Sequence, residues 1–208
     1  MFKTMHSTVR LAVWQKRTHS MVVSRDSVTE LSWDSPEDMK ANFADEYVRS
    51  KVGPDGKNFS DELCALSLVT SDVERHVAHP AQACGAKVMH FMRAIEGLEL
   101  NEFFERWEKA HNRVVADNVI VAETVRRCVH HQQLPEFNPM LAYFGAKDMP
   151  IYEGVGSLWF DDVSSISAFR VYEKGLMAVN ADPDTAFYNP EQSFFVYATE
   201  VPIYERHA

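Results

Sequence analysis

The order of elements predicted between residues 87 and 204 constrains the fold of this chain most. A helix is predicted from Asn101 to about Val114, with Asn101 as its N-cap. Apolar side chains recur there at three- and four-residue steps, as on the buried face of an amphipathic helix: Leu100, Phe103, Phe104, Trp107, Ala110, His111 and Val114. A short apolar run at residues 87–93 predicts a strand before this helix.

Three further strands and a second helix are expected after the first helix. The strands are predicted at residues 124–132, 154–160 and 193–199. The second helix is predicted to begin at Asp161 and to run to about Lys174, with Gly175 as its stop. The resulting order, β-α-β-β-α-β, is that of a ferredoxin-like split unit, so the expected fold class is α+β.

Part of this pattern recurs near the start of the chain. Residues 8–13 resemble 124–129, residues 31–35 resemble 158–162, and the apolar run 63–70 corresponds to 194–199. We therefore predict a partial module (β-β-α-β) at 1–72, holding the second strand onward, a linker at 73–86 and a complete module at 87–208. The similarities are also compatible with ordinary strand-turn-helix segments that share no repeat.

Composition and charge exclude several classes of partner. The 208 residues carry a net charge of −9, which argues against nucleic acid and against anionic membrane surfaces. No apolar run approaches the roughly 18 residues of a membrane span, and residues 1–10 lack a signal-peptide core. Cys64, Cys84 and Cys128 form an odd, dispersed set, typical of reduced thiols in a cytoplasmic protein. No cysteine pair has zinc-site spacing, and we expect no metal.

One helix motif resembles a known family. Phe103, Trp107 and His111 form the pattern F-x-x-x-W-x-x-x-H, which resembles the EthD-like family of dimeric α/β-barrel proteins, as does the Leu-Trp-Phe-Asp segment at 158–161. The resemblance covers residues 86–204 well and 8–72 partially. It implies a ferredoxin-like dimeric α/β barrel, a homodimer, and cofactor-independent chemistry on aromatic compounds. The first module has no counterpart of the helix motif, so the chain has one such histidine.

Four histidines are candidates for proton transfer, for which imidazole is suited near neutral pH. His111 lies on the apolar helix face, at the position of the family motif. His130 and His131 are adjacent on a predicted strand, so they point to opposite faces and cannot bind one metal from that strand. One of them is expected to face the barrel interior. His90 lies in the first strand. Each could instead be a packed, structural histidine.

Two arginines and two aromatic residues are candidates for substrate binding. By strand alternation Arg126 shares a face with His130, and Arg127 shares one with His131. An arginine beside a histidine could hold a carboxylate or phenolate while a proton moves. Tyr197 could donate a hydrogen bond to a phenol or carbonyl, and Trp159 could line the pocket.

The leading functional hypothesis is a cofactor-independent lyase, of the decarboxylase, dehydratase or cyclase type, acting on a small aromatic or phenolic acid. A cofactor-free monooxygenase is the alternative, which oxygen uptake would distinguish. A non-catalytic module for small-molecule binding or stress response is a third hypothesis. For an enzyme, His111→Gln is expected to lower turnover at least about a hundredfold while the protein stays folded.

Overall fold

The computed structural model describes residues 28–58, 65–81, 84–141, 150–201 and 203, and the backbone of residues 7–12. The described strands form a seven-stranded sheet in the order β2-β1-β3-β5-β6-β4-β7. The strands are β1 (Ser7–Ala12), β2 (Thr29–Trp33), β3 (Leu66–Arg75), β4 (Ala86–Met92), β5 (Arg127–Gln133), β6 (Gly154–Phe160) and β7 (Phe194–Ala198). The longer helices are α1 (Pro36–Ala44), α3 (Leu100–Asp117) and α6 (Ile166–Asn180), and the shorter ones are α2 (Gly53–Asp55), α4 (Val119–Thr124) and α5 (Asn138–Leu141).

The chain divides into two compact units that are each built from two segments. The first unit comprises Met1–Val73 and His131–Gly154, and the second comprises Glu74–His130 and Val155–Ala208. Strands β3, β5 and β6 each have residues in both units. The linear division of the chain at residues 73–86 stays a prediction.

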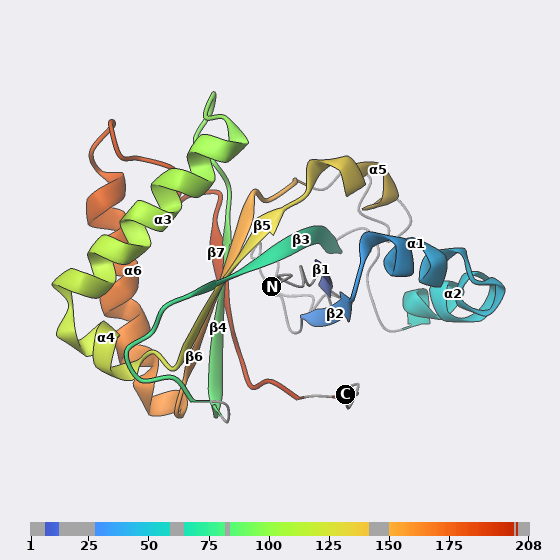
Figure 1. The fold of residues 1–208 in the computed structure, drawn as a ribbon, viewed down its shortest axis with the longest axis horizontal. Helices are drawn as coiled ribbons and strands as arrows, with labels where there is room; N and C mark the ends of the chain where they lie inside the picture. The colour runs from blue at the N-terminus through green and yellow to red at the C-terminus, as the bar shows by residue number, and fades with distance from the viewer. Residues whose placement is uncertain are drawn as a thin grey trace, which may run out of the picture. The chain divides into compact units, whose positions relative to one another are not determined.

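The second unit has the ferredoxin-like arrangement. Its strands lie in the order β5-β6-β4-β7, and β4 pairs with β7 in antiparallel register, with His90 opposite Phe195. Helices α3, α4 and α6 cover one face of these strands (Figure 1). The predicted strands at 87–93, 154–160 and 193–199 and the predicted helix after residue 100 are confirmed.

The apolar stripes of α3 and α6 explain why these helices cover the sheet. The buried side chains recur at helical spacing: Phe103, Trp107, Ala110, His111 and Val114 on α3, and Ala168, Phe169, Tyr172, Leu176 and Val179 on α6. Except for His111, these side chains form one apolar core together with Val88, Met92, Leu158 and Phe160 of the sheet. Their burial supplies the main stabilisation of this layer.

Several predicted boundaries were wrong. Helix α3 begins at Leu100 with Glu99 as N-cap, so Asn101 lies inside it. Residues 119–124 form α4, and the strand predicted from residue 124 starts at Arg127. Helix α6 begins at Ile166 and continues through Gly175 to Asn180. Gly175 therefore lies inside the helix and is not its stop. Its role is in packing, because a Cβ there would lie 2.6 Å from Cγ1 of Val114 in α3.

The elements of the first unit begin in the order β1, β2, α1 and β3, and the partial module at 1–72 stays a prediction. Strand β1 pairs in antiparallel register with both β2 and β3, so β2 and β3 run parallel on either side of it, with α1 between them in the sequence. A local sequence pattern does not select the partners of a strand, so this pairing comes from the tertiary structure.

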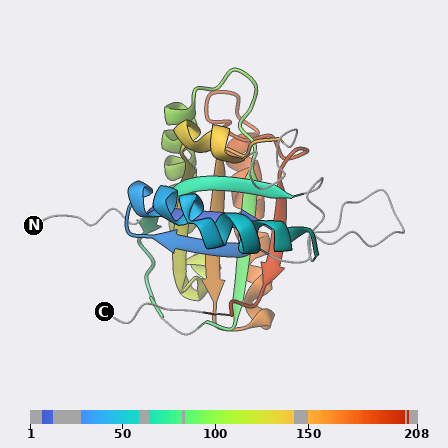
Figure 2. The same cartoon turned by 90° about the vertical axis from the view of Figure 1, so that its right-hand side faces the viewer.

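Helix α1 begins at a side-chain N-cap. Ser35 is the N-cap, and its Oγ accepts a hydrogen bond of 3.0 Å from the backbone N–H of Asp38. Met39 of this helix packs in a small core with Val69, Phe137 and Leu141. In Figure 2 α1 lies in front of the strands of its own unit. None of the helices in the described ranges has both the length and the apolarity for a membrane crossing.

Candidate functional site

Strand β5 divides its side chains between the two faces of the sheet. Cys128 lies in the core under α3 and α6, and His130 stacks on Trp107 of α3. His131 points the other way and contacts Asp72 of β3. The structure therefore brings His130 to His111 and keeps His131 apart from both.

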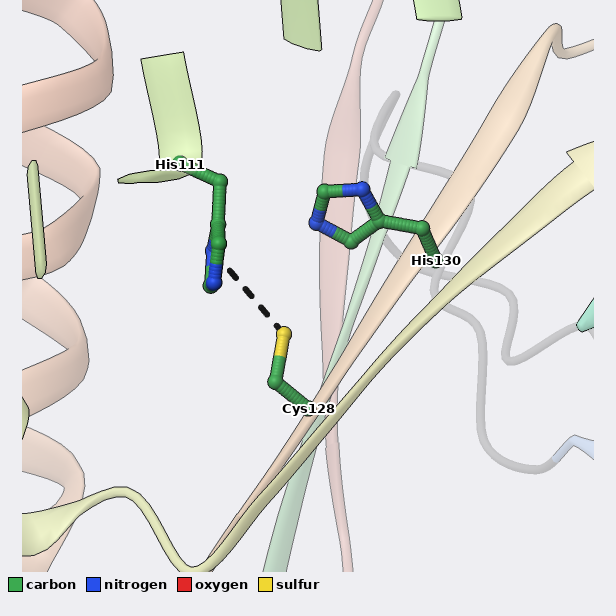
Figure 3. A group of neighbouring side chains, drawn as sticks. All are labelled: His111, Cys128 and His130. Carbon is green, nitrogen blue, oxygen red and sulfur yellow. Dashed lines mark hydrogen bonds between the residues drawn. The ribbon is translucent and has the colours of Figure 1, made fainter. Parts of the chain in front are cut away.

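His111, Cys128 and His130 form a buried cluster (Figure 3). Nδ1 of His111 lies 3.9 Å from Sγ of Cys128 and 2.9 Å from the hydroxyl of Tyr172 in α6. The rings of His111 and His130 meet edge to face, with their centroids 5.0 Å apart. All three side chains are at most 2% exposed.

Trp107 covers one face of the His130 ring. The two rings are parallel within 5°, and their centroids are 3.7 Å apart. Gly156 of β6 leaves room for the indole, because a Cβ at this position would lie 3.2 Å from Cζ2 of Trp107. The tryptophan of the helix motif thus positions His130. Neither the helix pattern nor the strand pattern in the sequence predicts this contact, because it joins two different elements.

Arg75 fixes the tautomer of neutral His130. Its Nε donates to Nδ1 of His130 at 3.1 Å, and its Nη1 donates to Glu108 at 2.6 Å. A guanidinium only donates, so Nδ1 is an acceptor and the neutral ring carries its proton on Nε2. Burial, together with the charge of Arg75, lowers the pKa of His111 to about 4, and burial raises the pKa of the Cys128 thiol to about 12. His111 and Cys128 are thus uncharged near neutral pH.

The donor atoms of this cluster are of the types that bind zinc or copper, and they lie within 4.8 Å of one another. The charges are unfavourable, however. A metal-bound histidine usually donates its second N–H to an acceptor, whereas His130 accepts from Arg75. The guanidinium would also repel a cation, and it lies where a metal-bound histidine usually has a carboxylate as acceptor. The absence of a metal stays a prediction.

His131 and Asp72 form a second polar group, on the other face of β5. Nδ1 of His131 lies 2.5 Å from Oδ1 of Asp72, and the His131 side chain is 0% exposed against 19% for Asp72. The partner strands β3 and β5 are neighbours in the sheet. Sequence reasoning selected His131 but missed Asp72, because no local pattern indicates that these two strands are adjacent.

Trp159 of β6 lies between two cations in the second unit. Nζ of Lys87 is 4.2 Å from the centroid of the indole ring, and Cζ of Arg127 is 4.6 Å from it. Glu200 accepts from Lys87 Nζ at 3.0 Å and from Trp159 Nε1 at 2.8 Å. Arg127 donates to Glu74. Lys87 and Glu200 were missed by sequence reasoning, whereas Arg127 and Trp159 were among the predicted residues.

His90 and Arg126, two further predicted residues, belong neither to the buried cluster of His111, Cys128 and His130 nor to the His131–Asp72 pair. His90 is buried against the rings of Tyr188 and Phe195, at 5.4 and 4.8 Å between centroids. Burial lowers its pKa to about 3. Arg126 precedes β5 and makes a two-fold contact with Asp161, at 2.9 and 2.8 Å.

Tyr197 lies at the surface beside an arginine. Tyr197 is 38% exposed, and its ring lies 5.6 Å from Cζ of Arg170. Cys84 and Cys128 are free thiols. Cys64 lies outside the described residues.

Comparison with solved structures supports the fold. A structure described as an anthrone oxidase-like protein matches with a TM-score of 0.55 and 10% identity, over 97% of this chain and 78% of that one. The Ascaris suum eIF4E-3 complex with m7G cap gives 0.32 and 9% identity, over 97% and 92% of the two chains. That second score is too low to support a shared fold. No curated protein matches this sequence.

The family is decided by sequence. Residues 2–63 and 95–191 match the EthD domain, which is more than half of the chain. Both matched segments contribute to the mixed α+β architecture described above, and the second contains His111, His130 and His131. The chain therefore belongs to the EthD domain family.

Proposed function

We propose that this protein is a cofactor-independent enzyme that transfers protons on a small aromatic or phenolic acid, as a lyase of the decarboxylase, dehydratase or cyclase type. Membership of the EthD family supports a small-molecule enzyme. The observation that carries the reaction type is the hydrogen bond of 2.5 Å between His131 and Asp72.

The pair has the composition of a general base and its orienting carboxylate. Asp72 holds the proton of His131 on Nδ1, which leaves Nε2 as the atom that accepts a proton from substrate. The carboxylate also stabilises the imidazolium that forms during transfer. Because His131 is fully buried, the substrate must displace the side chains that cover the ring.

Substitution of the pair tests this proposal. His131→Gln is expected to lower turnover about 10²- to 10⁴-fold, because Gln cannot shuttle a proton near neutral pH. Asp72→Asn is expected to lose at least about 10²-fold, because an amide can hold the ring in the wrong tautomer. Turnover is followed by chromatography on a panel of hydroxybenzoates and hydroxycinnamates.

His79→Gln is the matched control, because His79 is an exposed histidine that also contacts a carboxylate, Glu123 at 3.1 Å. Its turnover should equal that of the unaltered protein. Near-normal turnover of a folded His131→Gln protein would contradict the assignment. In that case His111, whose catalytic role stays a prediction, would be the next residue to substitute.

A cofactor-free monooxygenase is the second candidate. The structural neighbour described as anthrone oxidase-like has this fold, and the same base could deprotonate a carbon acid before it reacts with dioxygen. Oxygen uptake that matches substrate loss would support this reaction, and carbon dioxide or water release without oxygen uptake would support the lyase.

A further inference from the structure

Gln133 is a buried polar residue on the strand that also holds His131. It lies two positions further along β5, and successive side chains of a strand point to opposite faces, so Gln133 and His131 share one face. The burial agrees, because His131 is 0% and Gln133 is 5% exposed, whereas Gln132 between them is only partly buried. Two residues of a strand span roughly 7 Å, so one aromatic molecule with its substituents is long enough to reach both side chains.

The amide of Gln133 is held at its nitrogen end. Its Nε2 donates a hydrogen bond of 2.8 Å to Oδ1 of Asn138, the first residue of α5. The amide group is planar, so this bond also fixes the direction of the carbonyl oxygen Oε1 at its other end. Both residues belong to the first unit, as do His131 and Asp72.

Oε1 of Gln133 has acceptor capacity that the described part of the chain does not use. Within those ranges Gln133 makes one side-chain hydrogen bond, through Nε2, and one from its backbone N–H to the carbonyl of Glu153 at 3.1 Å. A carbonyl that is withdrawn from water without a donor costs free energy, which a donating ligand recovers. Because a carbonyl only accepts, the group that fits here is a hydroxyl or an N–H.

We propose that Gln133 selects the substrate of the His131 site by accepting a hydrogen bond from a free hydroxyl, so that the site takes phenols in preference to analogues without a donor. The inference rests on the proposed function in taking His131 and Asp72 as the reacting pair. Gln133 orients the hydroxyl and takes no part in proton transfer. The carboxylate of a phenolic acid lies away from Gln133, because a carbonyl oxygen repels an anion.

Hydroxycinnamates are the probes, each compared by calorimetry with the fluorocinnamate substituted at the same ring position. Fluorine is close to a hydroxyl in size but has no proton to donate. The unaltered protein is expected to bind one positional isomer of hydroxycinnamate about tenfold more tightly than its fluoro analogue, which leaves Oε1 without a donor. Gln133→Met keeps the length of the side chain but removes the amide, so it should abolish this preference.

Gln132→Met is the matched control, since it makes the same change one residue away on the opposite face and should keep the preference. Equal affinities in the unaltered protein, or a preference that Gln133→Met retains, would overturn the proposal. If Gln133→Met does not fold, the side-chain amide resonances of Gln133 in the unaltered protein decide. A shift with the hydroxycinnamate but not with its fluoro analogue supports the proposal, and the same response to both overturns it.

Binding and turnover separate this inference from the proposed reaction. A hydroxyl preference that depends on Gln133, in a protein without turnover, would contradict the reaction and leave the selection by Gln133 standing. Turnover that depends on His131, without any hydroxyl preference, would overturn the selection and leave the reaction standing.

Discussion

At the residue scale, burial keeps two histidines uncharged near neutral pH. His90 and His111 lie on the helix-covered face, and burial lowers the pKa of His90 to about 3 and that of His111 to about 4. An unfolded histidine titrates near 6.5. Below that pH the unfolded chain binds protons that the folded chain excludes, so acid favours unfolding.

The free energy of unfolding should therefore be highest above pH 6.5 and fall as the pH drops toward the folded pKa values. Between pH 7 and pH 5 each of these two histidines is expected to lower it by about 2 kcal/mol. Urea unfolding at the two pH values measures the difference. His111→Gln and His90→Leu should each reduce this pH-dependent difference by about 2 kcal/mol, the contribution of one histidine.

An unchanged m-value would show that these variants unfold to the same extent as the unaltered protein. A pH dependence that neither variant reduces would mean that other groups take up the protons. That result would also mean that the His111 imidazole of the unaltered protein is already exposed to water in the folded state. His111→Gln would then not report on a buried cluster.

At the element scale, the contact between α3 and α6 depends on one glycine. A Cβ at Gly175 would lie 2.6 and 2.9 Å from the two γ-carbons of Val114. Valine is restricted in χ1 within a helix, so its side chain cannot turn away at little cost. The position therefore requires glycine for interhelical packing, although glycine weakens a helix interior.

Gly175→Ala is expected to destabilise the protein by about 1–3 kcal/mol through overpacking, despite the gain of about 1 kcal/mol in helix propensity. The midpoint of urea unfolding measures the effect. In a Val114→Ala background the same substitution should cost little or stabilise, because the opposing methyl groups are gone.

Gly56→Ala is the matched control, since a Cβ at Gly56 would meet no atom within 4 Å, and it should change stability little. A stabilised Gly175→Ala protein would show that the helices can move apart freely.

At the scale of the whole molecule, the assembly state remains a prediction. The family resemblance implies a homodimer, and an open sheet with one incomplete module would need a partner to cover a face. Within the single chain, however, every residue of β4 and of β6 is already buried.

Sedimentation at micromolar protein concentration tests the homodimer directly. A mass of two chains would confirm the sequence prediction and would direct attention to the exposed apolar side chains, among them Tyr47, Val119 and Val163. A mass of one chain would instead show that the seven-stranded arrangement needs no second copy.

Periodicity alone determined much of the second unit. The three- and four-residue spacing of Phe103, Trp107 and Val114 predicted α3 and its buried face, because a helix places such residues on one side. Strand alternation likewise required His130 and His131 to point to opposite faces. Both rules are local, so a single segment of sequence contains all the information that they need.

Only the tertiary structure decided what those side chains contact. Asp72 reaches His131, and Glu200 reaches Lys87, across 59 and 113 positions of the chain. Gly175 looked like a helix stop because its contact with Val114 is invisible in the sequence around it. Strand order, helix approach and burial depend on residues far apart in the chain, whereas sequence patterns report only on neighbours. The sequence by itself therefore determined the main strands of the second unit and the buried face of α3, because those patterns are local. Tertiary packing determined the element boundaries and the groups that can carry chemistry, because both depend on contacts between distant residues.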